Sequence, residues 1–243
     1  MKHKQNEIPL IRTKLYRPSV TARVLGRERL DVELERALDL PLTLVAAPAG
    51  YGKSTAVTHW LEGADVPSAW LSLEETDNDL RVFLRYLVAA VNTIDSKACQ
   101  GTSRLLSADD LPGLSTLASC LNNDLDSIST RLILVLDDYH HINDQAIHDL
   151  LSNLLKHPAR RIHLLVVARR NPPLPLVSLR ARGVLNEIRV QNLQLREEET
   201  RAILERETGC QVCPEAVSHV QTLTEGWVVG LRLVTLSLRG RDD

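Results

Sequence analysis

Residues 47–54 read Ala-Pro-Ala-Gly-Tyr-Gly-Lys-Ser and directly follow the apolar run Leu42-Thr43-Leu44-Val45-Ala46. A strand, a glycine-bearing loop, Lys-Ser and then a helix predict a phosphate cradle. Backbone N–H groups and the positive end of the helix dipole then face the same anion. Lys53 would reach the β- and γ-phosphates of a nucleotide, and the Ser54 hydroxyl would lie on Mg²⁺. The first position of the motif, usually glycine, is Ala47, which fits wherever φ is negative.

This phosphate loop (residues 47–54) and the residue after it supply most of the expected nucleotide contacts. They are Ala49, Gly50, Tyr51, Gly52, Lys53, Ser54 and Thr55. Two arginines nearer the N-terminus, Arg17 beside Pro18 and Arg27, are candidates for the base and ribose side of the nucleotide.

Two carboxylates end a second apolar run, in which Leu132 to Leu136 precede Asp137-Asp138. A fully apolar run is typical of a central strand in a parallel sheet that is covered on both faces. Carboxylates at its C-terminal end face the sheet edge where open α/β sheets bind ligands. We therefore expect Asp137 to hold Mg²⁺ and Asp138 to orient an attacking water.

Arginines and histidines stand close to the same edge. Arg169 ends a strand expected over residues 162–168 and can reach a γ-phosphate, because a guanidinium pairs with phosphate oxygens and keeps its charge. Arg170 is the alternative, since the sequence does not decide which of the two points inward. His140 and His141 follow the aspartates, and we interpret them as structural hydrogen-bonding residues rather than catalysts.

Composition excludes several classes of protein. The 243 residues, 44% of them hydrophobic, suffice for one large α/β domain and a small extra piece. A net charge of −2 lacks the basic excess of a nucleic-acid-binding domain. With no apolar run of 18 residues and no signal-peptide pattern, we expect a cytoplasmic protein without membrane contact. Cys210 and Cys213 have no second pair or nearby histidines, so we expect no structural zinc site.

Apolar patterns predict alternating strands and helices up to about residue 190, and therefore a parallel sheet with right-handed crossovers. A helix should follow Asp77-Asn78-Asp79, with Asp77 or Asn78 as its N-cap. Residues 95–112 read as a long loop, either mobile or functional. The strands are expected at 42–47, 69–73, 132–137, 162–168 and 187–190.

Beyond residue 191 the pattern predicts helices alone, at 196–208, 214–224 and 227–238, and the last is apolar on most faces. The expected fold is thus an α/β P-loop NTPase: a five-stranded parallel sheet of order 5-1-4-3-2 with a C-terminal all-helical extension. We divide it into a segment lining the nucleotide (1–40), the core (41–190) and a helical subdomain (191–243).

The ordered set of motifs resembles the N-terminal ATPase domain of MalT-like transcriptional regulators. These are the large ATP-binding LuxR-type group within the STAND class of signal-transduction ATPases. The resemblance spans nearly the whole chain. It rests on residues 13–18, 47–54, 70–73 with 77–79, 136–140, 169 with 172–175, 179–183, and 224–227 with 230–231.

This resemblance implies a Mg-ATP switch in which ADP holds a resting monomer and ATP exchange permits self-association. Slow hydrolysis then resets the switch. It implies phosphate binding by Gly50, Gly52 and Lys53, Mg²⁺ binding by Ser54 and Asp137, water activation by Asp138 and γ-phosphate sensing by Arg169. It also implies that the inducer-binding repeats and the DNA-binding helix-turn-helix lie in domains absent from this chain, which we interpret as a fragment of a longer regulator.

Two other functions remain open at this point. One is a nucleotide-binding oligomerisation module that does not hydrolyse ATP, although the intact Asp137-Asp138 pair argues against it. The other is a small-molecule kinase, in which the arginines at 180 and 182 would belong to a lid. The all-helical C-terminal part favours the switch over the kinase.

Overall fold

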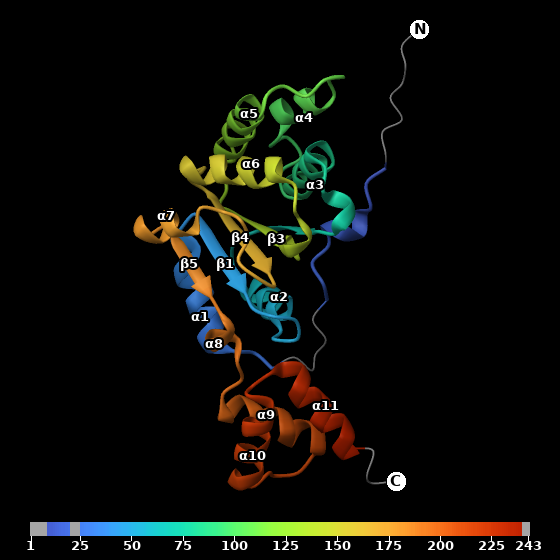
Figure 1. Cartoon of the computed structure of the whole chain (residues 1–243), viewed down its shortest axis with the longest axis vertical. Helices are drawn as coiled ribbons and strands as arrows, with labels where there is room; N and C mark the ends of the chain where they lie inside the picture. The colour runs from blue at the N-terminus through green and yellow to red at the C-terminus, as the bar shows by residue number, and fades with distance from the viewer. Residues whose placement is uncertain (1–8, 20–24, 240–243) are drawn as a thin grey trace.

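A computed structural model describes residues 9–19 and 25–239. The described residues fold around a central sheet of five parallel strands. The order β2-β3-β4-β1-β5 confirms the predicted order (Figure 1). The strands are β1 (Leu42–Ala46), β2 (Ser68–Ser72), β3 (Leu132–Asp137), β4 (Ile162–Ala168) and β5 (Leu185–Ile188).

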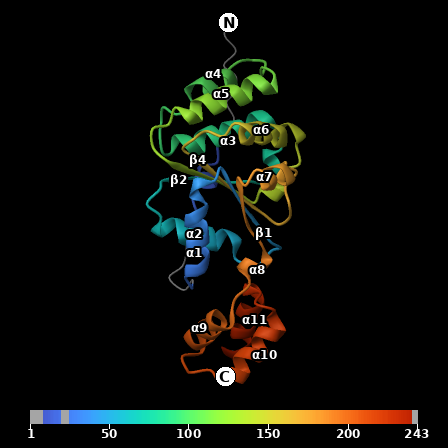
Figure 2. The same cartoon turned by 90° about the vertical axis from the view of Figure 1, so that its left-hand side faces the viewer.

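Helices cover both faces of the sheet (Figures 1 and 2). One face carries α3 (Leu80–Asn92) and α6 (Gln145–Lys156); outside them, α5 (Leu114–Asp126) packs on α6, and α4 (Gln100–Leu106) packs on α3 and α5 (Figure 2). The other face carries α1 (Glu28–Arg36) and α2 (Lys53–Gly63). Two short helices, α7 (Leu176–Ala181) and α8 (Val190–Leu193), flank β5.

The central strands are apolar on both sides because both sides are covered. In β1, Leu42 and Leu44 pack under the helices of the first face, while Val45 packs under those of the second. Side chains of β3 and β4 alternate in the same way. Alternation of this kind follows from the two-residue period of a strand. It explains why these runs read as continuously hydrophobic.

The chain folds differently from expectation at three places. Residues 95–112 contain α4, because the carboxylate of Asp124 on α5 accepts hydrogen bonds from the backbone and hydroxyl of Thr102. The N-cap of α3 is Asp79, since Asp77 is buried in an ion pair with Lys14. Strand β5 spans Leu185–Ile188 and ends before residue 190, because α8 already starts at Val190.

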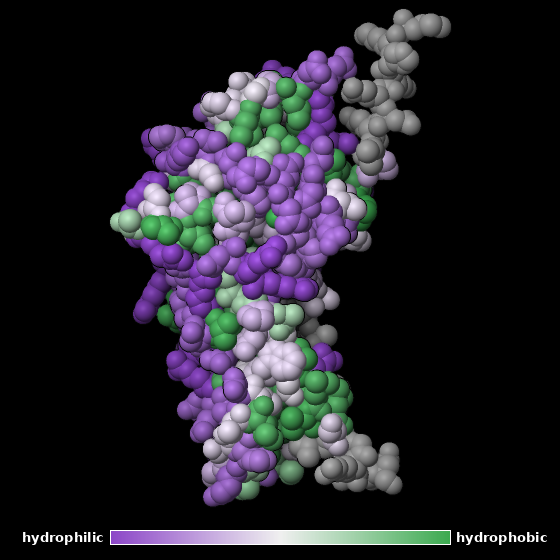
Figure 3. Space-filling view, viewed as in Figure 1, coloured by the Kyte–Doolittle hydropathy of each residue, from purple (hydrophilic) through white to green (hydrophobic). Residues whose placement is uncertain are grey.

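A separate helical group follows the core: α9 (Glu197–Thr208), α10 (Pro214–Thr224) and α11 (Val228–Arg239). Leu195, Leu204, Val217 and Leu231 form its own small hydrophobic core. Along α11 the side chains of Val229, Leu233 and Leu236 remain exposed, and hydrophobic residues gather over this helix in Figure 3. The predicted boundaries at residues 40 and 190 stay predictions. None of the described helices is long and apolar enough to span a bilayer.

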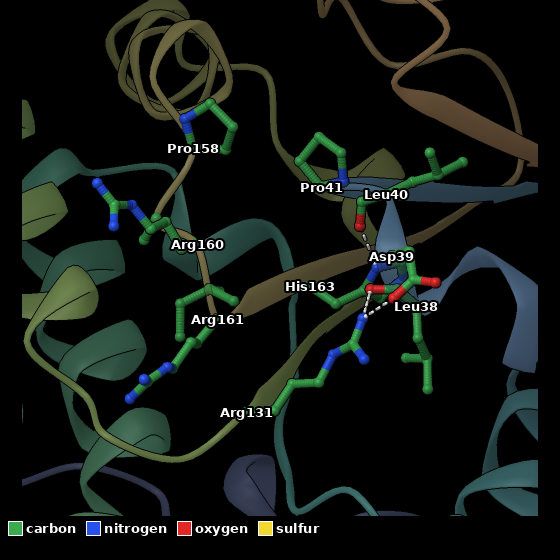
Figure 4. A pocket seen from close by; sticks show the side chains of 11 residues that line it. Leu38, Asp39, Leu40, Pro41, Arg131, Pro158, Arg160, Arg161 and His163 are labelled. Carbon is green, nitrogen blue, oxygen red and sulfur yellow. Dashed lines mark hydrogen bonds and ion pairs between the residues drawn. The ribbon is translucent and has the colours of Figure 1, made fainter.

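One cavity lies away from the phosphate loop, at the edge where the strands begin. It measures about 590 Å³ and is lined by residues 38–41, Arg131 and residues 158–163 (Figure 4). Arg131 closes one side by donating to Leu38 O and the Asp39 carboxylate. His163 is buried there, and its Nδ1–H donates to Leu40 O at 2.6 Å, since a carbonyl only accepts.

His163 makes the fold sensitive to acid. Burial lowers its pKa from 6.5 to about 4. Between these values the unfolded chain binds more protons, so stability falls as the pH drops from 6.5 towards 4. At pH 5 this amounts to about 2 kcal/mol. The variant His163→Asn keeps a donor for Leu40 O but cannot titrate in this range. We expect the free energy of unfolding, measured in urea, to fall by about 2 kcal/mol less between pH 7 and pH 5 in this variant than in the wild type. An unchanged pH dependence would contradict the assignment.

Candidate functional site

The phosphate loop lies at the C-terminal edge of the sheet, between β1 and α2. Gly50 and Gly52 have φ of 85° and 74°, a region that favours glycine, and α2 begins directly after Gly52. Ala47 is not among the described residues with positive φ, which explains why alanine is tolerated at the first motif position. Its N–H donates to Ala168 O at the end of β4.

Ser54 and Asp137 meet at this edge although they are 83 positions apart. The Ser54 hydroxyl donates to Asp137 Oδ1 at 2.8 Å, and Asp137 is 4% exposed. Burial, reinforced by the neighbouring Asp138, raises the Asp137 pKa to about 6. A buried carboxylate that touches a hydroxyl offers the hard oxygen ligands that Mg²⁺ prefers. Ser54 and Asp137 therefore fit Mg²⁺, the ion that the sequence analysis predicts at these residues.

Lys53 interacts electrostatically with the charged groups at this edge. Its Nζ donates to Pro48 O at 3.0 Å. Burial lowers the Lys53 pKa, Asp138 and Asp137 oppose that shift, and Arg169 adds to it. The charge of Arg169 is thus felt at Lys53, while Arg170 lines a separate cavity beside His140. The choice of Arg169 over Arg170 as the phosphate-facing arginine stays a prediction.

Asp138 has a constrained backbone. Its φ of 54° lies in the left-handed region, which few residues other than glycine adopt. Its N–H donates to Asp137 Oδ1 at 2.9 Å, which holds the Asp137 carboxylate against the backbone of Asp138. The Asp138 side chain is 46% exposed and therefore reachable by water.

The two N-terminal arginines differ in position. Arg27 lines a cavity of about 290 Å³ together with Gly52 and Thr55, opposite residues of α9 and α11. Its guanidinium donates to Leu193 O at 2.7 Å, and burial lowers its pKa. Arg17 follows a turn, Arg12–Leu15, that packs on β2 and α3. Within the described residues the structure gives Arg17 no hydrogen bond or ion pair, and it does not line this cavity.

The helical group contacts the phosphate loop directly, which sequence reasoning missed. Trp227 Nε1–H donates to Ala49 O at 3.1 Å, and the backbone N–H of Val229 donates to Gly50 O at 3.1 Å. A Cβ added at Gly50 would lie 2.4 Å from Trp227 Nε1. Arg206 and Arg232 of the same group line the cavity with Arg27. Gly226 and Trp227 belong to the motifs on which the resemblance rests. Nothing in their sequence position predicts a contact with residues 49–50.

Comparisons with known proteins agree with this geometry. No family model matches the chain. It is 35% identical over 231 residues to the HTH-type transcriptional regulator MalT of Yersinia pestis (strain Pestoides F), covering 95% of this chain and 25% of that protein. It is 33% identical over 230 residues to MalT of Klebsiella pneumoniae, with the same coverages. The chain thus spans about a quarter of the length of these relatives.

Among solved structures, a Walker-type ATPase of Pyrococcus abyssi is similar, with a TM-score of 0.56 and 13% identity. The match covers 90% of this chain and 69% of that one. At this identity the match shows the fold, a P-loop ATPase fold. With the sequence similarity over 95% of its length and this fold, the chain belongs to the MalT-like family, as a part of it that has the P-loop ATPase fold.

Proposed function

We propose that this domain binds ATP and ADP with Mg²⁺ and acts as a nucleotide-dependent switch, which slow hydrolysis of ATP resets. The observation that carries the proposal is the contact between Ser54 and Asp137 at the mouth of the phosphate loop. It brings the motif serine and the carboxylate of a neighbouring strand to the place where a nucleotide's metal ion would bind. The ion would neutralise charge on the phosphates.

Each nominated side chain has a part in this proposal. Gly50, Gly52 and the N-terminus of α2 cradle the phosphates through backbone N–H groups. Lys53 leaves Pro48 O and pairs with phosphate oxygens, and Arg169 contacts the terminal phosphate. Asp138 orients the attacking water and accepts its proton. Arg27 lies on the ribose side of the 290 Å³ cavity; Arg17 remains a candidate that no contact supports.

The switch itself is supported by the contact between the helical group and the phosphate loop. Ligands shift a two-state equilibrium only when they bind the two states with different affinity. Trp227 and Val229 hold carbonyl oxygens of the loop that wraps the phosphates, so nucleotide and helical group share one structural element. ATP would favour the arrangement that allows self-association. Inducer and DNA would act through other domains, in the cytoplasm.

Tryptophan fluorescence checks this coupling. The chain has three tryptophans, and Trp60 and Trp70 are 4% and 2% exposed, while Trp227 is half-buried on the phosphate loop. We expect ADP or Mg-ATP to change the emission of the wild-type chain, and Trp227→Phe to remove most of that change. Trp60→Phe is the matched control and should retain it. A full response in the Trp227 variant would show that the contact does not report nucleotide binding.

The proposal is tested by purifying the chain without added nucleotide, denaturing it and identifying what is released by chromatography. Near-stoichiometric ADP is expected. Size-exclusion chromatography with Mg-ATP then tests self-association. A protein that is empty and also fails to bind Mg-ATP would contradict the proposal.

Two alternative functions predict different results. For an oligomerisation module without hydrolysis, Asp138→Ala would leave ADP release and self-association unchanged, whereas Lys53→Ala would abolish both. For a small-molecule kinase, the chain would transfer a phosphoryl group to a metabolite. The intact carboxylate pair and the helical group on the phosphate loop favour the switch.

A further inference from the structure

An ion pair joins the core to the helical group. Arg29 lies in α1 and Glu199 in α9, 170 positions further along the chain. Arg29 Nε donates to Glu199 Oε1 at 3.0 Å, and Nη2 donates to Oε2 at 3.1 Å. The two side chains are 21% and 14% exposed. A pair that is closed by two parallel hydrogen bonds fixes direction as well as distance, so it holds α9 against α1 in one orientation.

Both members of this pair are charged at neutral pH. Burial raises the pKa of Glu199, but hydrogen bonds from Arg29 and from the backbone N–H of Arg196, at 2.9 Å, outweigh burial and hold that pKa below its usual value. A guanidinium keeps its proton throughout this range. Because both groups are largely shielded from water, salt screens their attraction less than that of an exposed pair.

Two arginines also hold the segment that leads from the core into α9. Arg29 donates to two of its carbonyl oxygens, one of them at 2.6 Å, and Arg27 donates to a third at 2.7 Å. The acceptors belong to three successive residues, Asn192, Leu193 and Gln194. A change at Glu199 therefore breaks the ion pair without leaving Arg29 unpaired.

The ion pair orients the face of α9 that lines the 290 Å³ cavity. Glu199, Ile203 and Arg206 stand at positions i, i+4 and i+7 and so share one face of the helix. Ile203 and Arg206 line the cavity opposite Arg27 and Gly52 of the core. Burial lowers the pKa of Arg27 and Glu199 raises it, so the carboxylate also acts on the arginine that faces the cavity.

The helical group is fastened to the core through each of the two helices that line this cavity. On α9 the contact is the ion pair with Arg29. On α11 it is the backbone N–H of Val229, which donates to Gly50 O of the phosphate loop at 3.1 Å. A ligand between core and helical group is thus enclosed by walls whose position depends on these contacts.

We propose that the ion pair of Arg29 with Glu199 is a latch, which holds the α9 wall of the cavity closed on the core and must open before bound ADP leaves. The inference rests on the proposed function, which places the nucleotide beside Arg27. Neither Arg29 nor Glu199 lines the cavity, so both act through the position of α9 and are positioning residues. Breaking the pair shifts the equilibrium towards the open arrangement, from which a ligand escapes faster.

The first test measures release of a fluorescent ADP analogue from the full 243-residue chain after excess unlabelled ADP is added. Glu199→Gln still accepts the N–H of Arg196 but has no charge, and we expect about tenfold faster release. Arg29→Gln should be at least as fast. The double variant should release no faster than Arg29→Gln alone, because both changes remove one interaction. The matched control is Glu198→Gln, at an exposed position beside Glu199, which should keep the wild-type rate.

The second test needs no nucleotide. The N–H of Val229 lies in the first turn of α11, where a helix offers no acceptor, and its partner is Gly50 O across the interface. Hydrogen exchange of this amide, followed by NMR, therefore reports opening of the helical group. We expect about tenfold faster exchange in Glu199→Gln, with unchanged exchange of the amides in β1.

The two tests separate a latch from a structural ion pair. A Glu199→Gln chain that is less stable in urea, yet keeps the wild-type ADP release and Val229 exchange, would overturn the latch and leave the proposed function intact. A double variant that releases ADP faster than Arg29→Gln would also overturn it. A wild-type chain that binds no ADP would contradict the proposed function, and Val229 exchange would then still decide whether the ion pair closes the helical group on the core.

Discussion

Replacing Lys53 by alanine is expected to lower the affinity of this chain for ADP and Mg-ATP by at least about a hundredfold. Lys53 is the cation at the centre of the phosphate loop, close to Asp137, Asp138 and Arg169. Hydrogen bonds to charged groups each contribute about 1.5–3 kcal/mol, and a loss of about 3 kcal/mol corresponds to about a hundredfold in Kd. Titration calorimetry with ADP measures the effect directly.

The matched control for this change is Lys156→Ala, at the exposed end of α6. It removes an equal charge from a lysine outside the site and should leave the ADP Kd within about twofold, because exposed charges interact weakly through water. Both variants should keep the wild-type helix content by circular dichroism. Tight ADP binding by a folded Lys53→Ala chain would show that the nucleotide site lies elsewhere.

Replacing Lys14 by methionine is expected to destabilise the fold by about 3–5 kcal/mol, the range for breaking a buried ion pair. Lys14 Nζ donates to Asp77 Oδ1 at 2.6 Å and Oδ2 at 2.5 Å, and to Glu74 at 3.1 Å. Asp77 is fully buried, so removing Lys14 leaves a carboxylate without its counter-ion. Urea unfolding measures the loss, and the melting temperature should fall by roughly 10 °C.

A second change checks the cause. Asp77→Asn removes the stranded charge but can still accept the N–H of Glu74, which the Asp77 carboxylate binds at 2.9 Å. The double variant Lys14→Met with Asp77→Asn should therefore recover much of the loss. Arg131→Met, which breaks an ion pair to the largely exposed Asp39, should cost less than about 1 kcal/mol. A Lys14 variant as stable as wild type would mean that the pair is not closed in solution.

The two predictions concern Lys53 and Lys14. The sequence predicts the partners of the first but not those of the second. Lys53 stands inside a local motif, where the spacing of glycine, lysine and serine already defines a loop between strand and helix. Its role could be predicted because it depends on residues next to it in the chain. Lys14 is separated from Asp77 by 63 positions, and no periodicity links the two. Asp77 was consequently assigned to a helix cap that Asp79 forms.

The same distinction holds for the nucleotide site. The apolar runs and the position of Asp137 at the end of one of them indicated the parallel sheet and the edge that carries the site. These follow because both-face burial requires continuous apolar strands, and parallel strands end at a common edge. What the sequence could not determine was which group approaches that edge from afar: the indole of Trp227, whose Nε1–H donates to Ala49 O.

The sequence by itself determined this protein's fold class and its phosphate loop, because both are set by local patterns in which each residue's neighbours along the chain decide its environment. Tertiary structure alone decided the burial of Lys14 against Asp77, the contact of α11 with the loop and the ion pair of Arg29 with Glu199. Each of these depends on where the helices and turns come to rest against the sheet, and packing sets that position over the whole molecule.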